Sequence, residues 1–172
     1  MCIRDRYNDD NILRRIEDFL ELAKGFGPRL GRCFLCFPNH VTIDRLGELL
    51  SFIDLLDTDL PLALELRHSS WFTSQEVALY SVAEALAKKN VSLIITDTPG
   101  RQDVLHSFIT SNDMMVRFVA SGNREADIKR IRAWRDFFLQ HKAWMTFACF
   151  VHSPTEKKDH LLPLMKSLQA IC

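Results

Sequence analysis

Short apolar segments of strand length alternate along this chain with longer amphipathic segments of helix length. Alternation of these two periodicities is typical of β-α-β units that build a parallel sheet. The segments of strand length cover residues 33–37, 61–67, 91–96, 114–119 and 145–151. The pattern therefore predicts an α/β fold in which five parallel strands are flanked by helices.

Helices are expected before, between and after these strands. Apolar residues recur at helical spacing in residues 11–24, 42–53 and 73–89, around Trp134, and again after Leu161. The stretch 97–111 has no clear helical pattern and is expected to be a long loop. No linker or low-complexity segment interrupts the chain, so we expect one domain over residues 8–172, preceded by a non-native or disordered prefix at residues 1–7.

The charge composition argues against two broad classes of function. Lys and Arg together number 22, as do Asp and Glu, so the net charge is zero and nucleic acid is not an expected partner. No apolar run reaches the roughly 18 residues that a membrane span needs, and the polar start contains no signal-peptide core. We expect a cytoplasmic protein that does not bind membranes, and the sequence predicts no oligomeric state.

The cysteines do not predict a disulfide framework or a metal centre. There are five, and they are scattered along the chain. Cys33 and Cys36 form a Cys-x-x-Cys string, but positions three apart in a strand face opposite sides of the sheet. The sequence therefore predicts no metal site, and it identifies no cofactor.

Four strings at the predicted strand ends, taken together, carry a resemblance. They are LELRHSSWF at residues 64–72, TDTPGR at 96–101, VRFV at 116–119 and FVH at 150–152. In this order they resemble the YecE-like family, known as domain of unknown function 72, from about Asn8 onward. That family is described as an eight-stranded β/α barrel, so the resemblance implies a partial TIM-type barrel that carries the last five parallel strands.

The resemblance also implies that the front of the barrel is missing from this chain. A complete barrel of this type needs about 250 residues. An arc of five strands cannot close, so both outer strands would present unpaired backbone groups. We therefore expect a truncated gene product.

Polar side chains follow the predicted strands at their C-terminal ends, where β/α barrel enzymes hold their active sites. Alternation along residues 62–68 places Glu65 and Arg67 on one face and three leucines on the face that suits the helices. Arg117 also points away from its apolar neighbours, and Asp97 and His152 close their strands. These side chains are expected to converge inside the barrel.

The candidate site residues divide into two roles. The catalytic candidates, which would exchange protons, are Glu65, Asp97 and His68. The candidates for holding an anionic group are Arg67, Arg117, His152 and Arg101. A structural ion-pair network is the competing interpretation, because a buried Glu or Arg needs a partner in any case. Capping or packing would equally explain the two histidines, and a surface pair with Asp103 would explain Arg101.

Three functional hypotheses remain open from the sequence. The first is a protein that binds a small anionic or sugar-like ligand at the strand ends, with or without catalysis. The second is a non-catalytic module for nucleic acid or a protein partner, which would use the same pocket or the basic residues Lys129, Arg130, Arg132 and Arg135. Those four residues are more simply a solvated helix surface. The third is an inactive fragment, because a site shared among eight strands would lack the contributions of the missing first strands.

Overall fold

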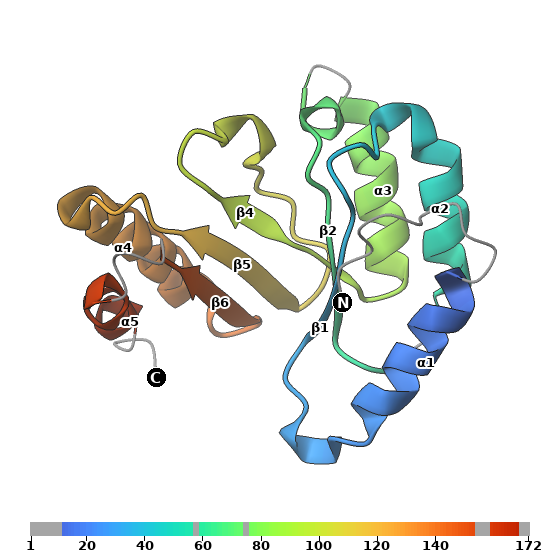
Figure 1. Ribbon diagram of the computed structural model, residues 1–172, viewed down its shortest axis with the longest axis horizontal. Coiled ribbons are helices and arrows are strands. Elements are labelled where there is room, and N and C mark those ends of the chain that lie inside the picture. The colour runs from blue at the N-terminus through green and yellow to red at the C-terminus, as the bar shows by residue number, and fades with distance from the viewer. Residues whose placement is uncertain (1–11, 57–58, 74–75, 154–158, 169–172) are drawn as a thin grey trace.

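The computed structural model describes residues 12–56, 59–73, 76–153 and 159–168 (Figure 1). The predicted prefix at residues 1–7 lies outside the described residues. Among the described helices, none combines the length and the apolar character needed to span a membrane.

The strands form two three-stranded parallel sheets. The first contains β1 (Cys33–Cys36), β2 (Leu62–Glu65) and β3 (Ser92–Leu93), in that order. The second contains β4 (Ile95–Asp97), β5 (Asp113–Val119) and β6 (Thr146–His152). The predicted α/β class and the parallel direction of the strands are confirmed.

The prediction of one continuous third strand is wrong, because the structure divides it at Ile94. β3 pairs with β2, β4 pairs with β5, and the backbone N–H of Ile94 donates to the carbonyl of Leu64 at 2.8 Å. A side chain from the following loop accounts for the division. The Thr110 hydroxyl accepts from the N–H of Leu93 and donates to the carbonyl of Val91, so a side chain replaces a neighbouring strand along that edge of β3.

The helices lie outside the two sheets and leave the strands between them (Figure 1). Three of them lie beside the first sheet: α1 (Ile12–Lys24), α2 (Leu46–Leu55) and α3 (Glu76–Lys88). Beside the second sheet lie α4 (Arg124–His141) and α5 (Leu161–Leu168). The link from β4 to β5 is an extended segment with one short 3-10 turn at Gln102–Val104, as the missing helical pattern predicts.

Helix boundaries follow local signals that the sequence carries. Asn90, with a φ of 53°, ends the helical conformation just after α3, because Asn tolerates the left-handed conformation. The Asn123 side chain caps α4 by accepting from the N–H of Ala126 at 3.2 Å. Pro163 lies in the first turn of α5, where its missing N–H breaks no helical hydrogen bond. The expected start at Thr42 is replaced by a 3-10 turn, Ile43–Arg45, that leads into α2.

Strand alternation sorts the apolar side chains into an outer core and an inner layer. The outer side chains Leu62, Leu64 and Leu66 are buried in the core beneath the first group of helices, as predicted. On the inner face, Ala63, Ile94 and Met115 form a small buried layer. Cys33 packs in the outer core and Cys36 faces inward, so the prediction that they face opposite sides is confirmed.

The two sheets curve toward each other across the inner face. The rings of Phe34 from β1 and Phe150 from β6 lie 6.0 Å apart between centroids. At the N-terminal ends of the strands, Arg32 pairs with Asp113 at 2.7 Å and donates to the Thr146 hydroxyl at 3.1 Å. The first and last strands therefore meet through side chains, although in the described part of the chain the sheets do not close.

Candidate functional site

Glu65, at the C-terminal end of β2, is the centre of a polar cluster on the inner face. Its Oε1 accepts from the Thr96 hydroxyl at 2.9 Å and from Nε of Arg117 at 2.8 Å. Its Oε2 accepts from the Cys36 thiol at 2.9 Å and from two nitrogens of Arg67, at 2.9 and 3.1 Å. We call these five residues the Glu65 cluster; three of them are the residues that the sequence predicts to converge.

The cluster joins strands far apart in sequence, because register brings inward positions together. Cys36 is opposite Glu65 in the β1–β2 pair, and Thr96 is opposite Arg117 in the β4–β5 pair. Sequence reasoning missed Cys36 and Thr96. Both occupy inward positions of predicted strands. Cys and Thr also fit apolar strands, so neither residue by itself predicts a polar site.

Hydrogen bonding and neighbouring positive charge hold Glu65 ionised despite its burial. The side chain is 0% exposed, whereas those of Arg67 and Arg117 are 28% and 23% exposed. Burial alone would raise the pKa of Glu65, but the hydrogen bond from Cys36 and the positive charges of Arg117 and Arg67 outweigh it and lower the pKa. A carboxylate so fully engaged is better suited to orienting the two arginines than to exchanging protons.

The Glu65 cluster carries a surplus of positive charge. Two guanidinium groups face one carboxylate, and both arginine side chains reach solvent. In the described part of the chain, Arg117 uses only its Nε for a hydrogen bond within the protein. Its terminal amino groups therefore keep their hydrogen-bonding capacity at the end of the strands.

His152 lies on the same face as Arg117, at the end of β6. Its backbone carbonyl accepts from the N–H of Ala120 at 2.8 Å, while the residue as a whole is exposed. Partial desolvation and the positive charge of Arg117 lower the pKa of His152, and the negative charge of Glu65 opposes them. His152 thus lies within the electrostatic field of the Glu65 cluster without a direct bond to it.

His68 and Arg101 lie at the rim and organise backbone. The His68 Nδ1 accepts from the N–H of Ser70 at 3.1 Å and caps the 3-10 turn Ser69–Trp71. Arg101 pairs with Asp103 at 2.9 Å, as the sequence allows, and also donates to the carbonyl of Arg67 at 2.9 Å. Arg101 therefore holds the β4–β5 link against the residues that follow β2.

Asp97 does not join the Glu65 cluster. It follows Thr96 by one residue, so it points to the outer face, toward α4. There it pairs with Arg130 at 2.5 Å and accepts from Nε1 of Trp134 at 2.9 Å. The predicted convergence therefore holds for Glu65, Arg67 and Arg117 but not for Asp97.

Arg130 belongs to a buried network, so its interpretation as solvated helix surface is wrong. Besides Asp97, it pairs with Asp127 at 3.1 Å and lies over the Phe118 ring at 4.4 Å. Asp127 is fully buried and also binds Nε2 of His160 at 3.0 Å. The sequence does carry a signal, because Asp127 and Arg130 lie on the helical stripe of Ile131 and Trp134.

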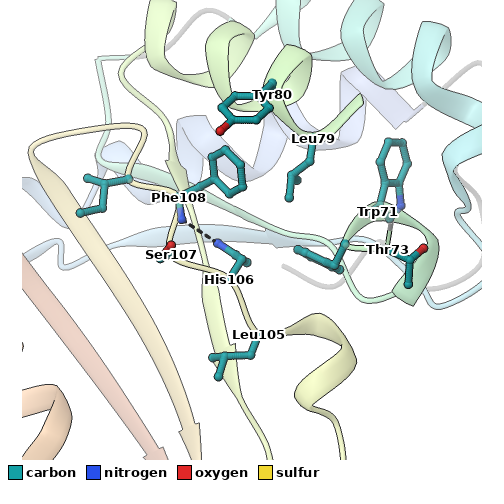
Figure 2. A pocket seen from close by; sticks show the side chains of 10 residues that line it. Trp71, Thr73, Leu79, Tyr80, Leu105, His106, Ser107 and Phe108 are labelled. Atoms are coloured by element: carbon teal, nitrogen blue, oxygen red, sulfur yellow. Dashed lines mark hydrogen bonds between the residues drawn. The ribbon is translucent and has the colours of Figure 1, made fainter. Parts of the chain in front are cut away.

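A separate pocket of about 580 Å³ lies between α3 and the β4–β5 link (Figure 2). His106 from the link lies beside it, with Nε2 on the carbonyl of Ile94 at 3.1 Å and Nδ1 accepting from the N–H of Phe108 at 3.2 Å. Its ring stacks on Phe72 with centroids 5.3 Å apart. Trp71 is fully buried and donates to the carbonyl of Val41 at 2.8 Å, so it anchors the chain before α3.

We expect acid to destabilise the protein partly through His106. Burial lowers the pKa of His106 from 6.5 to about 4. Between these values the unfolded chain binds a proton that the folded chain does not, so stability falls as pH drops, by about 3 kcal/mol in total from this residue. Urea unfolding from pH 7 to pH 4 should show a steeper loss for the wild type than for His106→Phe. Equal slopes would contradict this account.

Comparison with known proteins identifies the family. A family model described as "Protein of unknown function DUF72" matches residues 3–170. The chain belongs to the DUF72 family. The resemblance drawn from the strand-end strings is thereby confirmed.

A curated relative and a solved structure that match this chain are both longer than it is. The UPF0759 protein YecE of Escherichia coli strain K12 is 21% identical, over 81% of this chain and 57% of that protein. A crystal structure of a DUF72 family protein from Enterococcus faecalis V583 superposes with a TM-score of 0.63 at 17% identity, over 91% of this chain and 65% of that one. The chain thus spans less than two thirds of either relative, and the structural likeness concerns the fold alone.

Proposed function

We propose that the described strands are an arc of a β/α barrel, with the Glu65 cluster at the C-terminal end of its interior. Three features support this. Among the described residues, the strand pairs are all parallel, the helices lie on the outer side, and inward side chains stack in layers from the Arg32–Asp113 pair through Ala63 to Glu65. Layered filling of the interior is typical of such barrels, and their ligand sites lie at this end.

We further propose that the DUF72 chain binds a small anionic ligand at the Glu65 cluster. The positive surplus of Arg67 and Arg117 over Glu65 is the observation that carries the proposal. Glu65 holds the Nε edge of Arg117, which leaves the terminal amino groups to form the paired hydrogen bonds that carboxylates and phosphates accept. Anion binding would neutralise the surplus charge in a partly desolvated place.

The same geometry favours a binding role for Glu65 over a catalytic one. Because both of its oxygens are engaged, Glu65 positions the arginines, and any proton transfer would fall to another group such as His152.

A nucleic-acid surface on α4 finds less support. Its outer surface mixes signs: Lys129 and Arg132 lie beside Glu125 and Asp136, and Arg135 pairs with Asp136 at 2.7 Å. Binding along a phosphate backbone needs a continuous positive stripe.

Calorimetric titration of the 172-residue chain with inorganic phosphate and with acetate tests the anion site. We expect millimolar or tighter binding that Arg117→Gln weakens at least about tenfold, since a charge-assisted hydrogen bond contributes about 1.5–3 kcal/mol. Lys129→Gln is the matched control and should bind as the wild type does. Arg117→Lys, which keeps the charge without the planar fork, should fall between them.

Two results would overturn the proposal. One is the absence of saturable anion binding by the wild type. The other is unchanged binding by Arg117→Gln when its circular dichroism spectrum shows the native fold.

A further inference from the structure

Arg117 and His152 occupy neighbouring inward positions on paired strands. In the β5–β6 register Arg117 is opposite Phe150, and Val119 is opposite His152. His152 therefore lies two residues nearer the C-terminal ends than Arg117, a rise of about 7 Å along the strands, with one interstrand spacing of about 4.8 Å between them. The Arg117 and His152 side chains together can bridge this separation, so both can contact one anionic group of a ligand at the rim.

Thr98 provides a second, independent sign of a ligand at this rim. Its Oγ1 is buried and has no hydrogen-bond partner among the described residues. Thr98 directly follows β4 and comes two residues after Thr96, whose hydroxyl binds Glu65; from strand alternation we infer that its side chain lies on the same inward face. A buried hydroxyl without a partner costs about 1–3 kcal/mol, which an oxygen-rich ligand would recover by accepting from it.

Charge selects among the possible anions. The Glu65 cluster offers a net single positive charge, which one carboxylate or one phosphodiester would balance. A phosphomonoester concentrates a charge of about −1.5 to −2 on one tetrahedral group with several acceptor oxygens. It would need one more cation, and His152 is the titratable side chain placed to become that cation.

We propose that the anion site takes the phosphate of a phosphomonoester, with Arg117 and a protonated His152 binding it together. This inference rests on the proposed anion-binding function and names its ligand class. It makes His152 the residue that distinguishes monoesters from monoanionic ligands.

The electrostatics of the Glu65 cluster support this assignment. Partial desolvation and Arg117 keep the pKa of His152 below its usual value, while Glu65 opposes them. The other inward neighbours, Cys36 and Thr96, contribute a thiol and a hydroxyl to the same face. A dianion bound at Arg117 would cancel the repulsion that disfavours protonation, so binding should draw a proton onto His152.

Calorimetry at pH 7 with methyl phosphate and dimethyl phosphate tests the inference, in two buffers of different ionisation enthalpy. We expect the monoester to bind at least about tenfold more tightly than the diester, with net proton uptake that the two buffers reveal. His152→Gln should lose both the preference and the proton uptake while keeping its affinity for the diester. His141→Gln, at the far end of α4, is the matched control and should behave as the wild type.

The possible failures separate the two proposals. If neither ester binds, the anion site itself is wrong. If both bind with equal affinity and without proton uptake, the anion site stands and the phosphomonoester inference fails. If proton uptake persists in His152→Gln, the proton resides on another group and the role of His152 is wrong.

Discussion

Glu65→Gln should lower the free energy of unfolding by about 3 kcal/mol or more. The substitution keeps the shape of the side chain but leaves Arg67 and Arg117 facing a neutral amide in a partly buried place. Removing one partner of a buried ion pair typically costs about 3–5 kcal/mol, because the remaining charge is desolvated without compensation. The exposure of the two arginines, 28% and 23%, places the expected loss at the lower end. Urea unfolding followed by circular dichroism measures it.

Glu84→Gln is the matched control for this substitution. Glu84 also pairs with a basic residue, Lys88 at 2.9 Å, but both side chains are exposed on α3. Exposed pairs contribute little to stability, so the control should unfold as the wild type does within the error of the measurement. Equal effects of the two substitutions would show that Glu65 is not the counter-ion that holds the cluster.

Arg130→Met should produce a loss of similar size, about 3 kcal/mol. It removes the cation between two buried carboxylates, Asp97 and Asp127, and two hydrogen bonds to the backbone carbonyls of Asp97 and Val119. The methionine chain can still pack on Phe118, so the loss reports mainly on charge and hydrogen bonding. Trp134 fluorescence offers a second observable. It should change in the variant because Nε1 of Trp134 donates to Asp97, the carboxylate that also pairs with Arg130.

Arg132→Met, two residues further along α4, is the matched control. Arg132 is exposed, so its replacement removes the same charge without uncovering a buried carboxylate. We expect its unfolding curve to overlay that of the wild type. If Arg132→Met destabilises the protein as much as Arg130→Met does, the effect belongs to the helix surface and the buried network has no special role.

Much of the candidate site follows from strand alternation alone. Leucines at 62, 64 and 66 mark the outer face, so Glu65 must point inward, and the same argument applies to Arg117. Alternation also explains the placement of Asp97, which lies one residue beyond the inward Thr96. The sequence analysis expects the strand to end at residue 96, whereas β4 includes Asp97, so the alternation also governs the direction of Asp97.

The sequence by itself determined the order of strands and helices, and it determined the inward or outward direction of most strand residues, with Asp97 as the exception. These properties depend on neighbours within a few positions, where side-chain period and turn residues act. Only the tertiary structure decided the division of the third strand at Ile94 and the buried role of Arg130 between the second sheet and α4. Both depend on partners at least 17 residues away, such as Thr110 for Leu93 and Asp97 for Arg130. The inner cluster likewise exists only because register brings Cys36, Glu65, Thr96 and Arg117 together, since no local pattern specifies which strand lies beside which.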